Sequence, residues 1–207
     1  MGTGTHVAGS ALPGIPAAAA TVTAVRNALT DHSGMDARHI TSVTDPESSS
    51  RFLDAVNQAA AQAEDVLLLY YIGHGLVNVP GELFLATSAT TGRDVMLPAE
   101  ALSFAAVRGV LSASRARHVV VVLDCCFSGR AWGTLGAALA DAFDLTNVQG
   151  SYLLSATSAT EQALAPPGEE YTAFSGALLE FLRDGDPAAP RGLTLDDAYR
   201  YLDRLLP

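Results

Sequence analysis

The sequence predicts an α/β domain of three layers, with a mostly parallel central sheet and helices on both of its faces. Segments typical of helices alternate with segments typical of strands along most of the 207 residues. Two of the strand segments, 66–72 and 119–123, are apolar or aromatic at every position. Such runs are typical of central parallel strands that helices cover on both sides. The length fits one domain spanning residues 1–207.

The first part of the chain predicts two helices with a short strand between them. Residues 16–33 form the first helix, which Pro16 opens and Gly34 follows. Its apolar face carries Val22, Val25 and Leu29. Residues 38–43 (RHITSV) are a strand candidate, and residues 45–65 predict the second helix. That helix has apolar residues at helical spacing, namely Phe52, Val56, Ala59 and Ala63.

Strands and helices continue to alternate from residue 65 to the last helix. The predicted strands are 65–75, 82–86, 118–126 and 151–157. The predicted helices are 98–114, with Leu102, Ala106 and Val110 on one face, 171–185, which Gly185 ends, and 194–206. Thr194 and Asp197 are spaced as a capping box at the start of the last one.

The charge and composition exclude several classes of protein. A net charge of −10 and a pI near 4.7 argue against nucleic acid or an anionic membrane as a partner. The first fifteen residues lack the basic start and apolar core of a secretory signal, and no apolar run is long enough to span a membrane. The two cysteines are adjacent, where a disulfide would be strained, so we expect a reducing, cytoplasmic location. All 12 basic residues are arginine, which is typical of a high-GC bacterial genome when alanine and glycine are also abundant.

Reactive side chains stand at the ends of two of the predicted central strands. His74 ends one strand between two glycines, and Cys125 and Cys126 end the other. The carboxyl ends of parallel strands gather at one edge of a sheet, so the histidine and a cysteine meet there if the strands are neighbours. An imidazole beside a thiol raises the thiolate fraction and can later protonate a leaving amine. A thiol and an imidazole are the smallest set of side chains that can carry out acyl transfer to sulfur.

Other roles for these residues remain open at this point. A histidine or cysteine at a strand end can be a packing residue. A redox pair is more often spaced Cys-x-x-Cys. A zinc site needs three or four ligands, and the other histidines show no ligand spacing: His6, His32, His39 and His118.

The two strand ends together carry a resemblance to a known family. "YYIGHGL" followed by "LDCCFSGRA" resembles the caspase-like cysteine peptidases, particularly the bacterial ones related to metacaspases. Cys126 follows His74 by 52 residues, close to the separation of about 50 seen in caspases. The caspase pentapeptide itself is replaced by "DCCFSG". The similarity extends from about Thr5 to the last helix and implies the three-layer caspase-like sandwich.

The resemblance implies a role for each residue of the two motifs. The family's nucleophile is the second residue after the aspartate, which is Cys126, and its general base and acid corresponds to His74. The backbone N–H groups of Gly75 and Cys126 would hold the oxyanion. Cys125 occupies a variable position, where we expect a packing role.

Charge and resemblance agree on specificity. Asp124 stands where caspases that cut after aspartate have glutamine, as it does in metacaspases. A carboxylate in an enclosed pocket attracts a guanidinium or ammonium group, so we expect cleavage of protein or peptide substrates after Arg or Lys. The alternative is that Asp124 only accepts hydrogen bonds from loop backbone. Because lysine is absent, self-cleavage would use an arginine, and Arg130 is the candidate site.

Three further expectations follow from the resemblance. Some metacaspases are activated by calcium, but the chain has no dense carboxylate loop, so we expect no metal and no cofactor. Family members open with an apolar strand that "MGTGTH" lacks, so an upstream segment, another segment or another chain would fill its place. Relatives often carry appended effector or sensor modules. The leading hypothesis is a cysteine endopeptidase in bacterial stress, defence or cell-death signalling; the alternatives are a non-catalytic interaction domain and a thiol redox switch.

Overall fold

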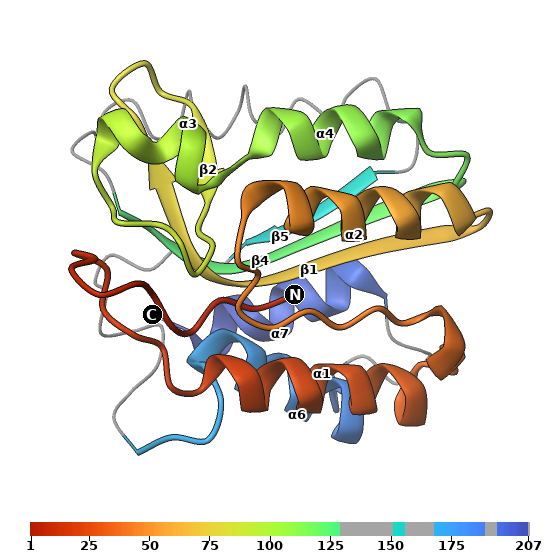
Figure 1. Cartoon of the computed structure of the whole chain (residues 1–207). Coiled ribbons are helices and arrows are strands. Elements are labelled where there is room, and N and C mark those ends of the chain that lie inside the picture. The colour runs from red at the N-terminus through yellow and green to blue at the C-terminus, as the bar shows by residue number, and fades with distance from the viewer. Residues whose placement is uncertain (129–150, 156–167, 189–193, 207) are drawn as a thin grey trace.

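A computed structural model describes residues 1–128, 151–155, 168–188 and 194–206, with the backbone alone described at 126–128 and 151. Its centre is a five-stranded sheet in the order β3-β2-β1-β4-β5 (Figure 1). The strands β1, β4 and β5 are parallel to one another, and β2 and β3 join the edge in antiparallel orientation. Their bounds are β1 Val66–Val77, β2 Leu83–Leu85, β3 Leu102–Ser103, β4 His118–Ser128 and β5 Ser151–Ser155.

Helices cover both faces of this sheet, which confirms the predicted three-layer class. On one face lie α2 (Ser49–Gln62) and α4 (Phe104–Ala113), and on the other lie α1 (Ala18–His32), α6 (Ala173–Asp184) and α7 (Leu195–Leu205) (Figure 1). The described part of the chain also contains the shorter helical segments η1 Ala37–His39, η2 Asp94–Met96 and α3 Leu97–Glu100. The capping box predicted for the last helix is present, with Thr194 and Asp197 bonded in both directions.

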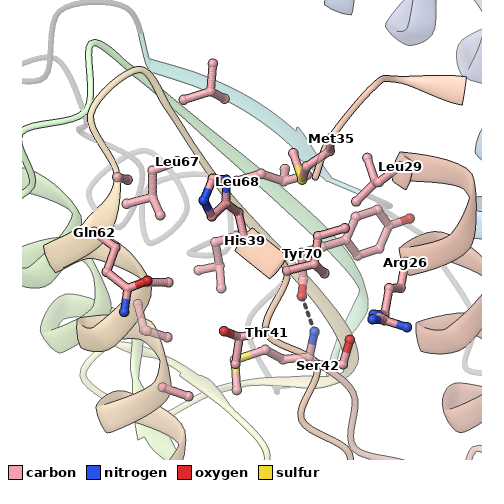
Figure 2. Close-up of a pocket in the computed structure, with 18 of the residues that line it drawn as sticks. Arg26, Leu29, Met35, His39, Thr41, Ser42, Gln62, Leu67, Leu68 and Tyr70 are labelled. Atoms are coloured by element: carbon pink, nitrogen blue, oxygen red, sulfur yellow. Dashed lines mark hydrogen bonds between the residues drawn. The ribbon is translucent and has the colours of Figure 1, made fainter. Parts of the chain in front are cut away.

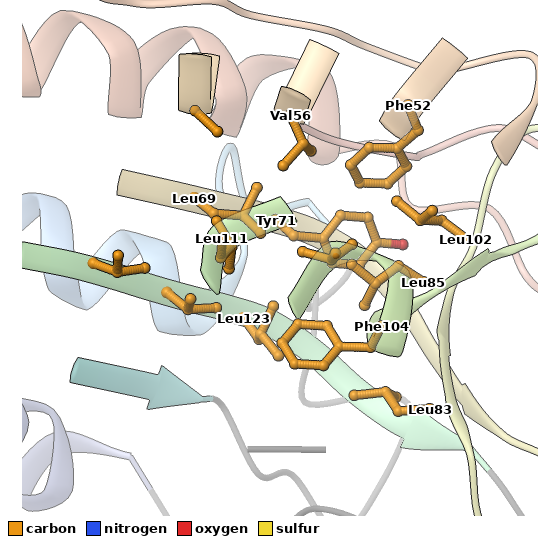
Figure 3. Packing of buried hydrophobic residues seen from close by; sticks show 14 of the residues in the cluster. Phe52, Val56, Leu69, Tyr71, Leu83, Leu85, Leu102, Phe104, Leu111 and Leu123 are labelled. Carbon is orange, nitrogen blue, oxygen red and sulfur yellow. The ribbon is translucent and has the colours of Figure 1, made fainter. Parts of the chain in front are cut away.

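Strand β1 divides its side chains between two apolar cores. Leu67, Leu69 and Tyr71 belong to the core under α2 and α4, whereas Tyr70 and Ile72 belong to the core on the α1 and α6 side. Phe52 of α2 stacks on Tyr71 with ring centroids 5.6 Å apart (Figure 3). This division follows from the alternation of side chains along a strand and explains why the run has no polar position.

The strand predicted at 38–43 is absent from the structure. Residues 37–39 form the 3-10 helix η1, and of the following residues only Thr44 makes a bridge, to Gly2. A strand needs a neighbour along its length to pair its backbone groups. The only chain that pairs with this segment, among the described residues, is the short stretch around Gly2.

The single helix predicted at 98–114 is also wrong, because it is divided into α3, β3 and α4. Ala101 is extended, and Leu102 and Ser103 pair with β2. The hydroxyls of Thr87 and Thr90 donate to the carbonyl of Glu100 and so replace the helical hydrogen bond there. Tertiary pairing therefore outweighs the helical pattern of the sequence.

The first residues of the chain lie along the free edge of β1. Gly2 bridges Ile72 on one side and Thr44 on the other, in parallel orientation to both. The amino group of Met1 donates to the carbonyl of Tyr70 over 2.7 Å. Burial lowers the pKa of this amino group from 8.0 to about 5. Residues 1–3 thus lie beside β1 at Tyr70 and Ile72.

Candidate active site

The position of His74 near the end of β1 is fixed by its own strand. The buried ring of Tyr71 folds over Gly73, and its hydroxyl donates to the carbonyls of His74 and Ala86 over 3.1 Å each. A Cβ at residue 73 would lie 2.3 Å from the Tyr71 hydroxyl oxygen. Glycine at residue 73 is therefore what lets Tyr71 hold the backbone of the histidine.

The imidazole of His74 is oriented by a backbone carbonyl. Its Nε2 lies 2.8 Å from the carbonyl oxygen of Pro13, in the loop before α1, and the side chain is only 3% exposed. A carbonyl can only accept, so Nε2 carries the proton and Nδ1 of the neutral ring keeps its lone pair. This tautomer is the one that leaves Nδ1 able to take a proton. The sequence suggested no such orienting group, because any residue can supply a carbonyl.

A second histidine, His6, lies beside His74. The two ring centroids are 5.5 Å apart, and Nδ1 of His6 is 3.1 Å from the carbonyl oxygen of Thr87. Nε2 of His6 is buried with no hydrogen-bond partner in the described part of the chain. Desolvation, more than the proximity of His74, lowers the pKa of His6. The sequence gives His6 no ligand spacing, and its nearness to His74 comes from the path of the loop before α1.

Strands β1 and β4 are neighbours, as the meeting of the two strand ends requires. Their parallel register pairs residue 74 with residue 126 and residue 73 with residue 125. Cys125 is fully buried in the core under α2 and α4, which agrees with its expected packing role. Backbone pairing thus brings the positions of His74 and Cys126 together. The other expected oxyanion donor, Gly75, follows in β1 and is paired in register with Leu85 of β2.

Asp124 lies two residues before Cys126 in β4 and is completely buried. Its Oδ2 accepts hydrogen bonds from the hydroxyls of Thr172 and Ser175, at the start of α6. Tyr70 extends this network, since its hydroxyl lies 2.7 Å from the Ser175 oxygen. Oδ1 of Asp124 has no hydrogen-bond partner among the described residues. The contacts come from the residues that begin α6, with the hydroxyls of Thr172 and Ser175 and the backbone of Ser175 as donors.

The environment of Asp124 makes its charge costly. Burial raises the pKa of this carboxyl from 3.8 to about 6, although the Ser175 and Thr172 hydroxyls favour the charged form. A strongly shifted carboxyl with one oxygen fixed and the other unpaired is the kind of group found at functional sites. The sequence did not identify Thr172 and Ser175, although their three-residue spacing places both hydroxyls on one face at the start of α6.

The proposed self-cleavage residue, Arg130, lies outside the described residues. Within the described residues no helix is both long enough and apolar enough to cross a membrane.

The register places a histidine position beside a cysteine position on adjacent parallel strands, and a thiol with an imidazole base is the arrangement that thiol-dependent hydrolases use. The comparison with protein families is consistent with this class. A family model of the caspase domain, the C14 peptidase family, matches residues 15–206. The chain belongs to this family of cysteine peptidases. A search of curated proteins found no match to the chain.

Proposed function

We propose that the chain is a cysteine endopeptidase that cleaves after arginine, and after lysine, with Cys126 as nucleophile and His74 as base. The observation that carries this proposal is the register that pairs residue 74 with residue 126. The hydrogen bond from His74 to the Pro13 carbonyl supports it, because this bond keeps the single proton of the neutral ring on Nε2. The bacterial setting in stress, defence or cell-death signalling, the cytoplasmic location and the absence of a cofactor belong to the same proposal.

The proposed reaction follows the usual course of acyl transfer to a thiol. Nδ1 of His74 takes the thiol proton of Cys126 as the sulfur bonds to the carbonyl carbon of the substrate. The backbone N–H groups of Gly75 and Cys126 bind the negative oxygen, a contribution of about 3–4 kcal/mol per donor in comparable sites. The imidazolium then protonates the departing amine, and water hydrolyses the thioester to release the acid and restore the thiol.

Asp124 is the proposed determinant of specificity. Its Oδ2 is held by hydroxyl groups, and its Oδ1 has no partner among the residues that the structure describes, so the buried carboxylate can accept a charge-assisted hydrogen bond from a guanidinium. An acidic side chain at the same place would put two carboxylates together in a medium of low dielectric constant. We therefore expect arginine first and lysine second, because arginine presents two parallel N–H donors and lysine only one point charge.

Hydrolysis of fluorogenic peptides that end in Arg, Lys or Asp tests both the proposed nucleophile and the proposed specificity. We expect the wild type to release fluorophore from the Arg and Lys peptides and not from the Asp peptide. Cys126→Ala should abolish this activity because the sulfur is the atom that attacks, whereas Cys125→Ala, the adjacent matched control, should retain it.

Each other outcome has a definite meaning. Turnover by Cys126→Ala would exclude Cys126 as the nucleophile, and a preference for Asp would exclude the role of Asp124. A folded wild type that cleaves none of the peptides would favour the non-catalytic interaction domain. The redox switch would be favoured if both cysteine variants were inactive and the wild type were active only after treatment with a reductant.

A further inference from the structure

A cluster of buried polar side chains lies where α6 begins, between β1, β4 and α1. None of its members is more than 8% exposed, and they are Thr21, Tyr70, Asp124, Thr172 and Ser175. In Figure 2 the ring of Tyr70 extends from β1 toward α1. Polar groups in such a place cost stability unless each is hydrogen-bonded, and apolar side chains carry no such cost. Packing alone therefore does not account for the cluster.

The hydrogen bonds of the cluster have a fixed direction when Asp124 is charged, because a carboxylate can only accept. The hydroxyls of Thr172 and Ser175 both donate to Oδ2 of Asp124. A hydroxyl has one proton, so the oxygen of Ser175 accepts in turn from the hydroxyl of Tyr70, 2.7 Å away. The donors thus run from Tyr70 through Ser175 to Asp124. Hydrogen bonds of this direction favour the charged form of the carboxyl.

The start of α6 is built around the same carboxylate. Thr172 is the N-cap residue of α6, but its side chain accepts no hydrogen bond from the helix. In an ordinary cap, the side-chain oxygen accepts from the N–H of the second or third helical residue. Here the Thr172 hydroxyl donates to Asp124, and the backbone of Ser175, the third residue of α6, also donates to this carboxyl. Asp124 therefore takes the place of the capping side chain, and the helix dipole favours its negative charge.

The two oxygens of the carboxylate have different surroundings. Oδ2 accepts both hydroxyls, whereas Oδ1 is buried with no hydrogen-bond partner among the described residues. A buried charged oxygen without a partner is costly, and a cation placed against it removes the cost. Asp124 precedes residue 126 by two positions in β4, about 7 Å along the strand. The unpartnered oxygen therefore belongs to a residue close to the position of the proposed nucleophile.

We propose that Thr172 and Ser175 are positioning residues for substrate selection: their hydroxyls fix Oδ2 of Asp124 and hold the carboxyl in its charged form, so that Oδ1 is left to bind the basic side chain of the substrate. This inference rests on the proposed function, in which Asp124 binds arginine or lysine. Without either hydroxyl, the carboxyl loses a donor that favours its charge and can turn about its last side-chain bond. Both effects weaken the binding of a cation without altering the step at the thiol.

A pair of substitutions at Thr172 separates the hydroxyl from the shape of the side chain. Thr172→Val removes the hydroxyl and keeps the shape, whereas Thr172→Ser keeps the hydroxyl. With Arg- and Lys-ended peptides, Thr172→Val should raise KM about tenfold or more, because a hydrogen bond to a charged group is lost. It should leave kcat within about twofold, since this binding is the same in the ground state and the transition state. Thr172→Ser should keep KM within about twofold of the wild type. An unchanged KM in Thr172→Val would overturn the proposal.

The second hydroxyl is tested without leaving another buried group unpaired. Ser175→Ala alone would deprive the Tyr70 hydroxyl of its acceptor, so the substitution is made in Tyr70→Phe and compared with Tyr70→Phe alone. The double variant should show the higher KM, again about tenfold or more, with kcat within about twofold. An equal KM in the two proteins would contradict a positioning role for Ser175.

Thr21→Val is the matched control for a merely structural role. The Thr21 hydroxyl is also fully buried at the start of α6, where it accepts from the N–H of Thr172 over 3.2 Å. It donates to the carbonyl of Ala17 rather than to Asp124. Thr21→Val should therefore lower the melting temperature and leave KM for the Arg peptide unchanged. A rise in KM equal to that of Thr172→Val would mean that the hydroxyls only dock α6, which would overturn the proposal.

Asp124→Asn distinguishes failure of this inference from failure of the proposed function. If Asp124→Asn leaves KM for the Arg peptide unchanged, the proposed role of Asp124 is wrong. If it raises KM about tenfold or more while the variants of Thr172 and Ser175 do not, only the positioning role is wrong. Calorimetric binding of the Arg peptide to Cys126→Ala makes the same comparison without turnover. Adding Thr172→Val to this protein should weaken binding about tenfold or more, and equal binding would overturn the positioning role.

Discussion

Asp124 is the residue at which folding and the proposed function make opposite demands. Its carboxyl is fully buried, and its pKa is raised to about 6 because burial withdraws it from water. The folded protein therefore holds the carboxyl proton more tightly than the unfolded chain, in which the pKa of this carboxyl is 3.8. The resulting stabilisation is complete below about pH 4 and is lost as the pH rises through 6. At neutral pH the carboxylate destabilises the fold, and the proposed substrate contact explains why an acid is there.

Asp124→Asn should make the protein more stable above pH 6, by up to about 3 kcal/mol, since the amide has no charge to bury. The wild type should lose stability between pH 4 and 6 relative to the variant. Urea unfolding at pH 4.5 and 7.5 measures both effects. Arginine-ended peptides should be cleaved at least about tenfold more slowly by the variant, because a charge-assisted bond is lost.

The matched control for this change is Asp54→Asn, which alters an exposed acid on α2. It should change the free energy of unfolding by less than about 0.5 kcal/mol at either pH. An Asp124→Asn protein that is less stable than the wild type at pH 7.5 would contradict the destabilising role of the carboxylate.

The residues of the candidate site differ in whether the sequence alone could point to them. His74, Asp124 and Cys126 could be proposed from the sequence because they stand at the ends of apolar runs. The carbonyl of Pro13 was not, because backbone acceptors have no signature in the sequence. His6 reaches His74 only through the course of the loop before α1.

At the scale of the element, β1 positions the site through the contact between Tyr71 and Gly73. Gly73→Ala should displace the Tyr71 hydroxyl, since the new Cβ would lie 2.3 Å from it. The hydroxyl is buried and bonded to two carbonyls, so the displacement should cost about 1–3 kcal/mol. Thermal unfolding measures the loss.

Gly109→Ala is the matched control, because a Cβ there meets nothing within 4 Å. It lies within α4, where alanine is favoured over glycine by about 1 kcal/mol, so this variant should be as stable as the wild type or more so. If Gly73→Ala is no less stable than Gly109→Ala, the contact with Tyr71 does not constrain the strand.

The elements that the sequence predicted well are those whose pattern arises from burial alone. β1 and β4 were recognisable because helices cover both faces, which requires an apolar residue at every position. The segment at 98–114 was mistaken for one helix because its break depends on Leu102 and Ser103 pairing with β2 and on hydroxyls from Thr87 and Thr90. These contacts come from distant residues, so no local pattern contains them.

At the scale of the whole molecule, the two halves of β1 have different surroundings. The carboxyl half brings residue 74 beside residue 126 and is completed by β2. The amino half borders a cavity of about 660 Å³, which Leu67, Leu68 and Tyr70 help to line. The three-layer class followed from the order of helices and strands in the sequence.

Covalent labelling tests the central proposal most directly, because it identifies the nucleophile and its base together. The protein is treated with an arginyl chloromethyl ketone, digested, and analysed by mass spectrometry. We predict one label on Cys126, none on Cys125, and labelling at least about a hundredfold slower in His74→Ala, because general-base catalysis contributes about 10²–10⁴-fold. A label on Cys125, or equal labelling of Cys126 with and without His74, would contradict a His74–Cys126 catalytic pair.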